Sequence, residues 1–83
     1  MLDNFIESAS SLTPAERNIL QYYIRGHEIS EIPSLAYISI NTVRKHNKNI
    51  YRKLGVDTRD ELLIYIDLLR RSQRLEDLLR LLQ

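Results

Sequence analysis

Apolar residues recur every three or four positions along much of the chain, a spacing that predicts amphipathic helices. The first stripe consists of Leu2, Phe5, Ile6 and Ala9, and a polar stretch from 8 to 11 follows it. We therefore expect a short N-terminal helix whose apolar side covers part of the core.

The second helix has clear start and stop signals. Thr13 can cap the free backbone amides of a helix, and Pro14 is tolerated at its first position. Glu16 lies three residues after Thr13 and completes a capping box. Gly26 suits the left-handed conformation that ends many helices. Between these signals lies an apolar stripe made of Ile19, Leu20, Tyr23 and Ile24.

Pro33 complicates the segment from Ile29 to Tyr37, because a proline deep in a helix removes a backbone hydrogen bond. If Ser30 is the cap, Pro33 falls in the first turn, where it is tolerated. This arrangement predicts a short helix from about Glu31 to Ala36, followed by a turn at Tyr37 and Ile38.

A longer helix is predicted to begin after the cap Ser39 and to end at Gly55. Val43, Ile50 and Leu54 are seven and four residues apart and form one apolar stripe on it. The opposite face carries polar and basic side chains, namely Asn41, Arg44, Lys45, Lys48 and Arg52.

A fourth main helix is expected after Thr58, which would form a second capping box with Glu61. Its apolar stripe consists of Leu62, Leu63, Ile66 and Leu69, and Arg70 and Arg71 suit its C-terminal end. The predicted fold is all-α, with four main helices, a short N-terminal helix and a C-terminal helical extension. The expected boundaries are 1–11 for the N-terminal arm, 12–71 for the helix-turn-helix domain and 72–83 for a leucine-rich tail.

The tail has a leucine pattern that allows more than one interpretation. Leu68, Leu75 and Leu82 are seven residues apart, with Leu78 and Leu79 between them. These leucines can meet a partner helix in a homodimer, fold back over the protein's own core, or contact a different protein. An isolated short helix is marginal in water, so the tail is expected to need one of these partners.

Length and composition exclude several classes of protein. A chain of 83 residues suits one compact domain, and the absence of cysteine excludes disulfides and thiolate metal sites. No apolar run approaches the roughly 20 residues that span a bilayer, and we find no export signal, so we expect a cytoplasmic protein. No nucleophile, base and oxyanion donor can be assembled from these motifs. We therefore expect neither enzyme activity nor a cofactor.

The histidines and tyrosines can either contact a metal ion or nucleic acid, or pack within the protein. His27 and His46 have no carboxylate cluster at ligand spacing, so no metal site is expected. His46 suits either a phosphate contact or packing between its helix and the core. The five tyrosines are spread over four helical segments, which favours packing in the core and at its rim over stacking on single-stranded nucleic acid.

Charge is distributed unevenly along the chain. The net charge is only +1, yet residues 41–56 contain five basic residues and no acidic one, so the rest of the chain carries −4. A positive face on a nearly neutral protein is the pattern expected of a phosphate-binding element. A solvated helix face is the simpler alternative for such a run.

A short helix, a tight turn and a longer helix with a basic face are the elements that reading the DNA major groove requires. The groove accepts one helix, so the reading side chains must project from one side of it. The expected base-reading residues are Asn41, Arg44, Lys45 and Lys48. The expected backbone contacts are Ser39, Thr42, His46, Asn49 and Arg52.

The stretch from Leu12 to Leu69 resembles the LuxR-type helix-turn-helix domain of bacterial transcription regulators, also called GerE-type or NarL-type. That domain typically reads LTxxExxVLxxxxxG, then EIA, then ISxxTVxxHxxxIxxKLxV. The matching residues here are Leu12-Thr13-Pro14, Glu16, Ile19-Leu20, Gly26, Glu31-Ile32, Ile38-Ser39, Thr42-Val43, His46, Ile50 and Lys53-Leu54-Gly55-Val56. The match covers roughly 58 of 83 residues, and its third block is highly specific.

The resemblance implies that the helix after Ser39 is the recognition helix. It puts Arg44, Lys45 and Lys48 at base-reading positions, and Thr42, His46 and Asn49 where backbone contacts are common. It also implies dimers, often through the fourth helix, and a switch of transcription by contacting RNA polymerase or blocking it. Two positions depart from the pattern: Pro33 replaces a small alanine, and Ala36 stands where a larger apolar residue is usual. The helix that contains Pro33 is therefore expected to be shortened or tilted.

The sequence thus predicts a regulator that binds double-stranded DNA sequence-specifically, as a dimer on an inverted repeat in the bacterial cytoplasm and nucleoid. The alternative is a protein-interaction module that keeps this fold and uses its leucine-rich tail to bind or inhibit a partner regulator. Only eleven residues precede Leu12. We therefore expect either the effector domain of a longer regulator or a stand-alone protein controlled by its abundance or by a partner.

Overall fold

The computed structural model describes residues 2–83, and these residues form helices, short turns and no strand. The α-helices are α1 (Leu2–Ser8), α2 (Pro14–Ile24), α3 (Ile32–Ala36), α4 (Ile40–Leu54), α5 (Arg59–Arg71) and α6 (Leu75–Leu82). Two 3-10 turns, Ala9–Ser11 and Ile29–Glu31, precede α2 and α3. The predicted all-α fold is confirmed, including both terminal helices.

Local capping explains where three of the helices begin. The Thr13 hydroxyl accepts a hydrogen bond from the Glu16 amide, and the Glu16 carboxylate accepts one from the Thr13 amide at 2.9 Å, as predicted. Ser39 caps α4 and Thr58 caps α5 by accepting from the amide three residues later. The second capping box is only half formed, because within the described residues no bond returns from the Glu61 carboxylate to Thr58.

The start of the helix expected from about Glu31 to Ala36 differs from the prediction. Ser30 is not its cap; instead, the Glu31 carboxylate accepts a hydrogen bond from the Glu28 amide at 2.8 Å. This bond favours a 3-10 turn from Ile29 to Glu31, and α3 follows directly with Pro33 in its first turn. The Glu31 carboxylate therefore replaced Ser30 as the local capping group, and α3 is only five residues long.

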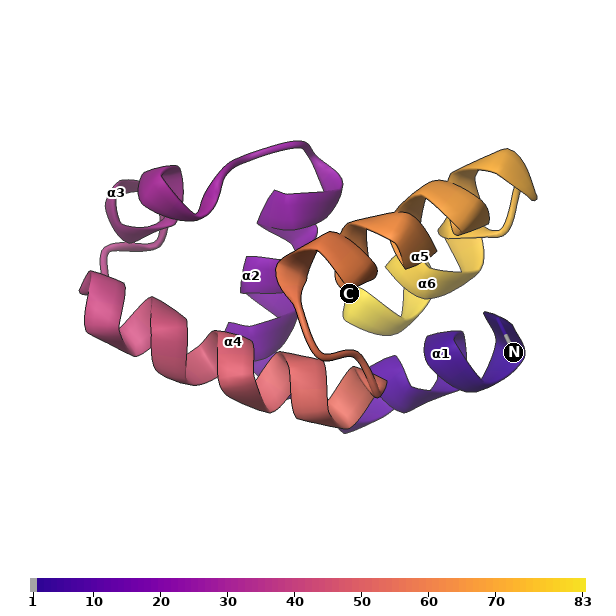
Figure 1. Ribbon diagram of the computed structural model, residues 1–83, viewed down its shortest axis with the longest axis horizontal. Helices are drawn as coiled ribbons and strands as arrows, with labels where there is room; N and C mark the ends of the chain where they lie inside the picture. Colours follow the sequence, from indigo (N-terminus) through magenta and orange to yellow (C-terminus); the bar gives the residue numbers. More distant parts are fainter. Residues whose placement is uncertain (1) are drawn as a thin grey trace.

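α2 lies at the centre of the molecule and packs against α3, α4, α5 and α6. Figure 1 shows α4 along one long edge, with α3 near its N-terminal end and the N-terminal segment near its C-terminal end. The apolar stripes predicted for α4 and α5 face inward, since Val43, Ile50 and Leu54 are buried, as are Leu62, Ile66 and Leu69. The core thus holds α4 by one side only and leaves its other side open.

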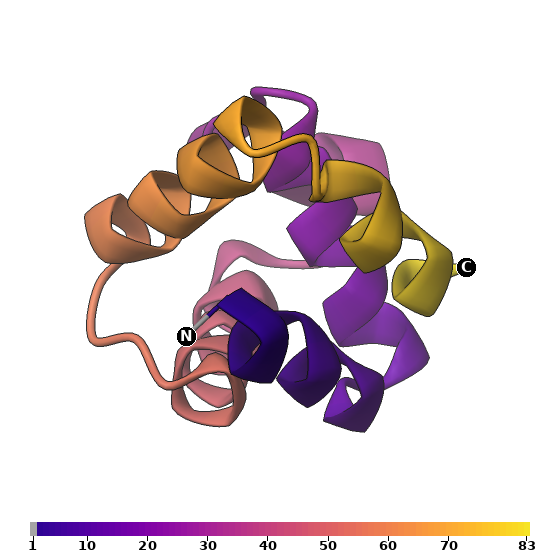
Figure 2. The ribbon, with the colours of Figure 1, turned by 90° about the vertical axis from the view of Figure 1, so that its right-hand side faces the viewer.

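The C-terminal helix α6 folds back over the protein's own core. Leu78 and Leu82 are buried there, and Leu75 and Leu79 are half-buried against it. α6 packs against α1 and α2, and Figure 2 shows the two terminal helices side by side. This is the second of the three arrangements considered for the tail. Pairing of Leu78 and Leu82 with a partner helix does not fit this packing, because both side chains are already covered.

Polar contacts fasten the same two helices. Arg74 lies 2.7 Å from the Asp3 carboxylate of α1 and 2.9 Å from the Asp77 carboxylate of α6. The Gln21 side chain of α2 donates to the Leu82 carbonyl at 2.9 Å. The termini are thereby joined into one core with the central helices.

Within residues 2–83, no helix has the length and apolar character that crossing a bilayer requires.

Candidate nucleic-acid interface

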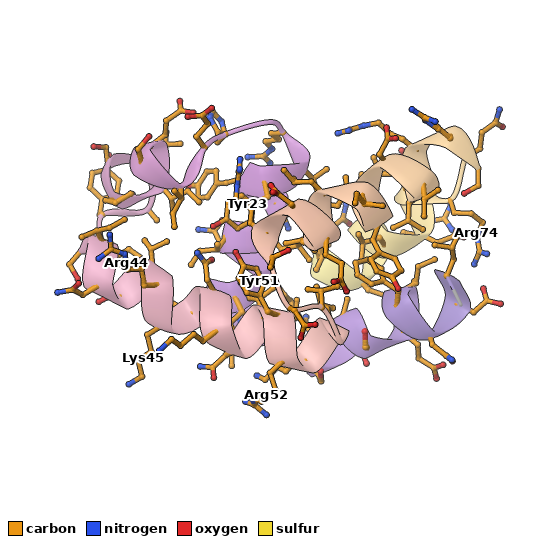
Figure 3. All side chains as sticks on the ribbon, viewed as in Figure 1. Tyr23, Arg44, Lys45, Tyr51, Arg52 and Arg74 are labelled. Carbon is orange, nitrogen blue, oxygen red and sulfur yellow. The ribbon has the colours of Figure 1, made fainter. Side chains whose placement is uncertain are left out.

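The polar face of α4 is a single exposed stripe, which we call the basic stripe. Its members are Asn41, Arg44, Lys45, Lys48 and Arg52, all of them exposed. Lys45 and Arg52 point away from the body of the molecule (Figure 3). The expectation that the four base-reading candidates share one open helix face is confirmed; their contact with bases remains a prediction.

The cations of this stripe are free of ion pairs within residues 2–83. Arg44, Lys45 and Lys48 take part in none of the salt bridges there, whereas the arginines of the C-terminal segment, Arg71, Arg74 and Arg80, each pair with an aspartate. A cation without an intramolecular partner needs no rearrangement to meet an external anion. The basic stripe is therefore the part of α4 best suited to phosphates and base edges.

The predicted backbone-contacting residues lie along the edges of the stripe. Thr42, His46 and Asn49 are four and three residues apart, so they share one flank of α4, and all three are half-buried. Ser39 is exposed at the start of the helix, and its hydroxyl lies 2.9 Å from that of Thr42. Arg52 donates to the Asn49 side chain at 3.4 Å. The geometry suits groups that border a groove, and their phosphate contacts remain predictions.

A buried ion pair that the sequence analysis missed connects α4 to α2. Lys53 Nζ lies 2.7 Å from Glu16 Oε1; the Glu16 side chain is 3% exposed and that of Lys53 is 21% exposed. Burial pushes the pKa of Glu16 upward, but hydrogen bonds from Lys53 and Thr13, with the Lys53 and His46 charges, outweigh it and hold the pKa below its ordinary value. The pair fixes the C-terminal half of α4 against the start of α2.

A second missed contact lies under the middle of α4. Asn47 is buried, and the Tyr23 hydroxyl of α2 donates to Asn47 Oδ1 at 2.9 Å. The Arg59 guanidinium of α5 lies 5.7 Å from the centre of the Tyr23 ring, within the range of a cation–π contact. Burial, reinforced by Tyr23, raises the pKa of Tyr51 to about 12. Tyr23 and Tyr51 lie on the inner side of α4 (Figure 3). This cluster joins α2, α4 and α5.

These two contacts give α4 a fixed orientation. A binding surface is most effective when it stands on a rigid element whose back is held by packing and hydrogen bonds. Glu16 was predicted only as half of a capping box, and Asn47 and Lys53 were not assigned to the back of the helix. A polar residue at a position of the apolar stripe, as Asn47 is, was the one available signal.

The tyrosines behave as packing residues with one exception. Tyr65 stacks on Phe5 with ring centres 4.6 Å apart, and the Tyr22 hydroxyl donates to the Leu35 carbonyl. Tyr23 is buried and Tyr51 half-buried. The packing interpretation is wrong for Tyr37, which is 93% exposed in the turn before α4.

The histidines lie apart from any cluster of metal-ligating side chains. Residues 2–83 contain no group of three or more His, Cys, Asp or Glu side chains that could hold a metal ion. His27 lies 3.4 Å from the Glu31 carboxylate and edge-on to the Tyr22 ring. His46 is half-buried, and its charge is the smallest of the causes that lower the pKa of Glu16.

Comparison with known proteins identifies relatives for most of the chain. Residues 10–66 match the family model described as bacterial regulatory proteins, luxR family. The transcriptional activator protein BglJ of Escherichia coli is 35% identical over 65 residues, covering 78% of this chain and 29% of BglJ. The transcriptional regulatory protein MctR of Rhizobium johnstonii is 37% identical over 59 residues, covering 71% and 28%.

The response regulator protein VraR of Staphylococcus aureus is 41% identical over 54 residues, covering 65% of this chain and 26% of VraR. The chain therefore spans less than a third of the length of each of these curated relatives. No solved structure gives a significant match to the chain.

Proposed function

Because the chain belongs to the luxR family of bacterial regulatory proteins, we propose that it is a sequence-specific DNA-binding transcription regulator, or the effector domain of one. The observation that carries the proposal is the exposed basic stripe on one face of α4, whose cations make no ion pair within residues 2–83. The major groove is about 12 Å wide and accepts one helix. In this proposal, α4 enters the major groove. The protein acts in the bacterial cytoplasm, where it binds DNA of the nucleoid.

We assign base contacts and phosphate contacts according to the position of each residue on or beside α4. Arg44, Lys45 and Lys48 read base edges, where arginine and lysine meet guanine O6 and N7, and Asn41 pairs with adenine. Thr42, His46 and Asn49 on the flank contact phosphates, together with Ser39 and Arg52 near the two ends. Binding then changes transcription by contact with RNA polymerase or by blocking it.

Alanine at Arg44 or Lys48 tests this proposal. Each substitution should reduce discrimination between the selected site and random duplex by about 1 to 3 kcal/mol, because a bidentate base contact is lost. Fluorescence anisotropy on a site selected from a random duplex library, at about 50 and about 200 mM salt, measures both affinity and salt dependence.

Arg80→Ala is the matched control, since it removes the same charge from an exposed position on α6. It should leave sequence selection unchanged. Selection that survives both α4 substitutions would mean that another surface reads the DNA. A wild-type chain that binds no duplex even at low salt would contradict the proposal altogether.

We also propose that the chain binds as a homodimer through α5, on an inverted repeat. Ile64 is 60% exposed and Leu68 is 37% exposed, four residues apart on the outer side of this helix. A contiguous exposed apolar surface with a polar rim is typical of an interaction site, and these two side chains would form its centre. Of the leucines considered for dimerisation, Leu68 is the exposed one, whereas Leu75, Leu78, Leu79 and Leu82 pack against the protein's own core.

The double substitution Ile64→Glu and Leu68→Glu should abolish dimerisation, because two carboxylates would face their copies across an apolar contact. Sedimentation with limiting protein on an inverted-repeat duplex should then show duplexes that carry a single chain, whereas the wild type should give free duplex and duplex with two chains. Arg71→Ala, an exposed change on the same helix, serves as control. Unchanged pairing on the inverted repeat in the glutamate variant would exclude α5 as the interface.

A module that binds a partner regulator without binding DNA is the weaker candidate. It was expected to use the leucine-rich tail, yet Leu78 and Leu82 are covered by the protein's own core. Contact with a partner regulator through another surface is compatible with DNA binding.

A further inference from the structure

Tyr37 is the large apolar residue that the fold leaves most open to solvent. It lies in the turn between α3 and α4 and is 93% exposed. Among the side-chain hydrogen bonds of residues 2–83, none involves its hydroxyl; the contact at this position is the backbone bond from its own amide to the Pro33 carbonyl. Within residues 2–83, the fold therefore gives the Tyr37 side chain neither a hydrogen bond nor burial.

The backbone at Tyr37 makes a tyrosine costly. Its φ of 58° and ψ of 43° lie in the left-handed region, which bulky side chains rarely adopt. Glycine is the usual residue at such helix ends, and this chain has glycine at two of them, Gly26 (φ 91°) and Gly55 (φ 74°). The other described non-glycine residue with positive φ is Gln73, whose polar side chain suits solvent. Glycine would therefore fit the backbone at position 37 better than tyrosine does.

The location of Tyr37 at the start of α4 indicates which part of a DNA duplex its side chain can contact. It precedes Ser39, the cap of α4, by two residues and Asn41, the first residue of the basic stripe, by four. Figure 1 shows this turn at the N-terminal end of α4, far from the C-terminal helix α6. A helix that enters the major groove brings the residues at its ends close to the sugar–phosphate backbone that borders the groove. Tyrosine offers both chemistries of that backbone, a flat apolar ring for deoxyribose and a hydroxyl donor for phosphate.

We propose that Tyr37 is a DNA-backbone contact that holds the N-terminal end of α4 at the groove edge, with its ring against deoxyribose and its hydroxyl donating to a phosphate. The inference rests on the proposed function and adds a residue outside α4 to the interface. Because backbone contacts carry no sequence information, Tyr37 contributes affinity to every duplex alike.

Two substitutions in the full chain, Tyr37→Gly and Tyr37→Phe, test this inference. The glycine variant should have a thermal unfolding midpoint at or above that of the wild type, by up to about 4 °C, because it removes the backbone conflict. Its affinity should fall about tenfold on the selected site and on random duplex equally. The phenylalanine variant keeps the ring and should lose about threefold, the share of one hydrogen bond.

Opposite signs of the stability and affinity changes distinguish a DNA contact from a folding role. A lower unfolding midpoint in Tyr37→Gly would assign the tyrosine to the fold and overturn the inference. If Tyr37→Gly binds DNA as tightly as the wild type while Arg44→Ala loses selection, the inference fails and the proposed function stands. If the wild type itself binds no duplex, the proposed function fails and the inference fails with it.

Discussion

Replacing Lys53 with methionine is expected to reduce the free energy of unfolding by about 3 to 5 kcal/mol. Methionine keeps most of the apolar stem but removes the ammonium group 2.7 Å from Glu16 Oε1. The Glu16 side chain is 3% exposed, so its carboxylate would be left as a buried charge. The hydrogen bond that it would keep is the one from the Thr13 backbone amide. Urea unfolding at neutral pH measures the loss.

The pH dependence of the two proteins should differ in a defined direction. In the wild type, the pKa of Glu16 lies below its ordinary value, so the pair stabilises the fold above about pH 4 and the contribution is lost as pH falls through the folded pKa. Without Lys53, its hydrogen bond and its charge no longer lower the pKa of Glu16, so this pKa should be higher than in the wild type. Protonation then relieves the penalty, so the stability difference between wild type and variant should shrink on acidification.

A double-mutant cycle isolates the pair. Glu16→Gln combined with Lys53→Met removes the unpaired charge and should recover a large part of the stability that Lys53→Met loses. A loss below about 1 kcal/mol for Lys53→Met would mean that the pair behaves as a solvent-screened surface bridge. Only the folded chain presents α4 to DNA. The same variant is therefore expected to weaken DNA binding in proportion to the fraction of unfolded chain.

Replacing Leu78 with alanine is expected to cost about 2 to 5 kcal/mol of unfolding free energy. The Leu78 side chain is fully buried between α6 and the rest of the core, so its truncation removes apolar contacts and leaves a cavity. Urea unfolding at two protein concentrations tests this expectation. The loss should be independent of concentration, because the leucine packs within one chain.

Leu35→Ala is the control for this substitution, since it makes the same chemical change at an exposed position of α3 and outside the proposed α5 interface. Its cost in the isolated chain should be under about 1 kcal/mol. The heptad interpretation of the tail makes the opposite prediction: Leu78→Ala would dissociate a dimer and change stability only in a concentration-dependent manner. That result would mean that α6 leaves the core to meet a partner helix.

Capping and periodicity are local, and they explain what could be predicted from the sequence. The Thr13–Glu16 box, the Ser39 cap and the left-handed Gly55 involve residues a few positions apart, and all three occur in the structure. The basic stripe follows from the same local geometry, because residues three or four apart on one helix share a face whatever the rest of the fold does.

Where two local signals competed, the sequence could not decide. Ser30 and Glu31 both lie just before α3, and in the structure it is the Glu31 carboxylate that accepts a hydrogen bond, from the Glu28 amide. The leucine repeat of the tail suited a partner helix as well as the protein's own core. The exposed tyrosine at position 37 was grouped with packing residues because composition does not tell which side chains find neighbours.

By itself, the sequence determined the helices, most of their ends and the face of α4 that carries the basic stripe, because each depends on contacts within one turn of the chain. The tertiary structure alone decided that Glu16 meets Lys53, 37 residues away, that Tyr23 meets Asn47, 24 residues away, and that α6 covers the core. Those contacts depend on how whole helices pack, and the spacing of residues along the chain carries no measure of that.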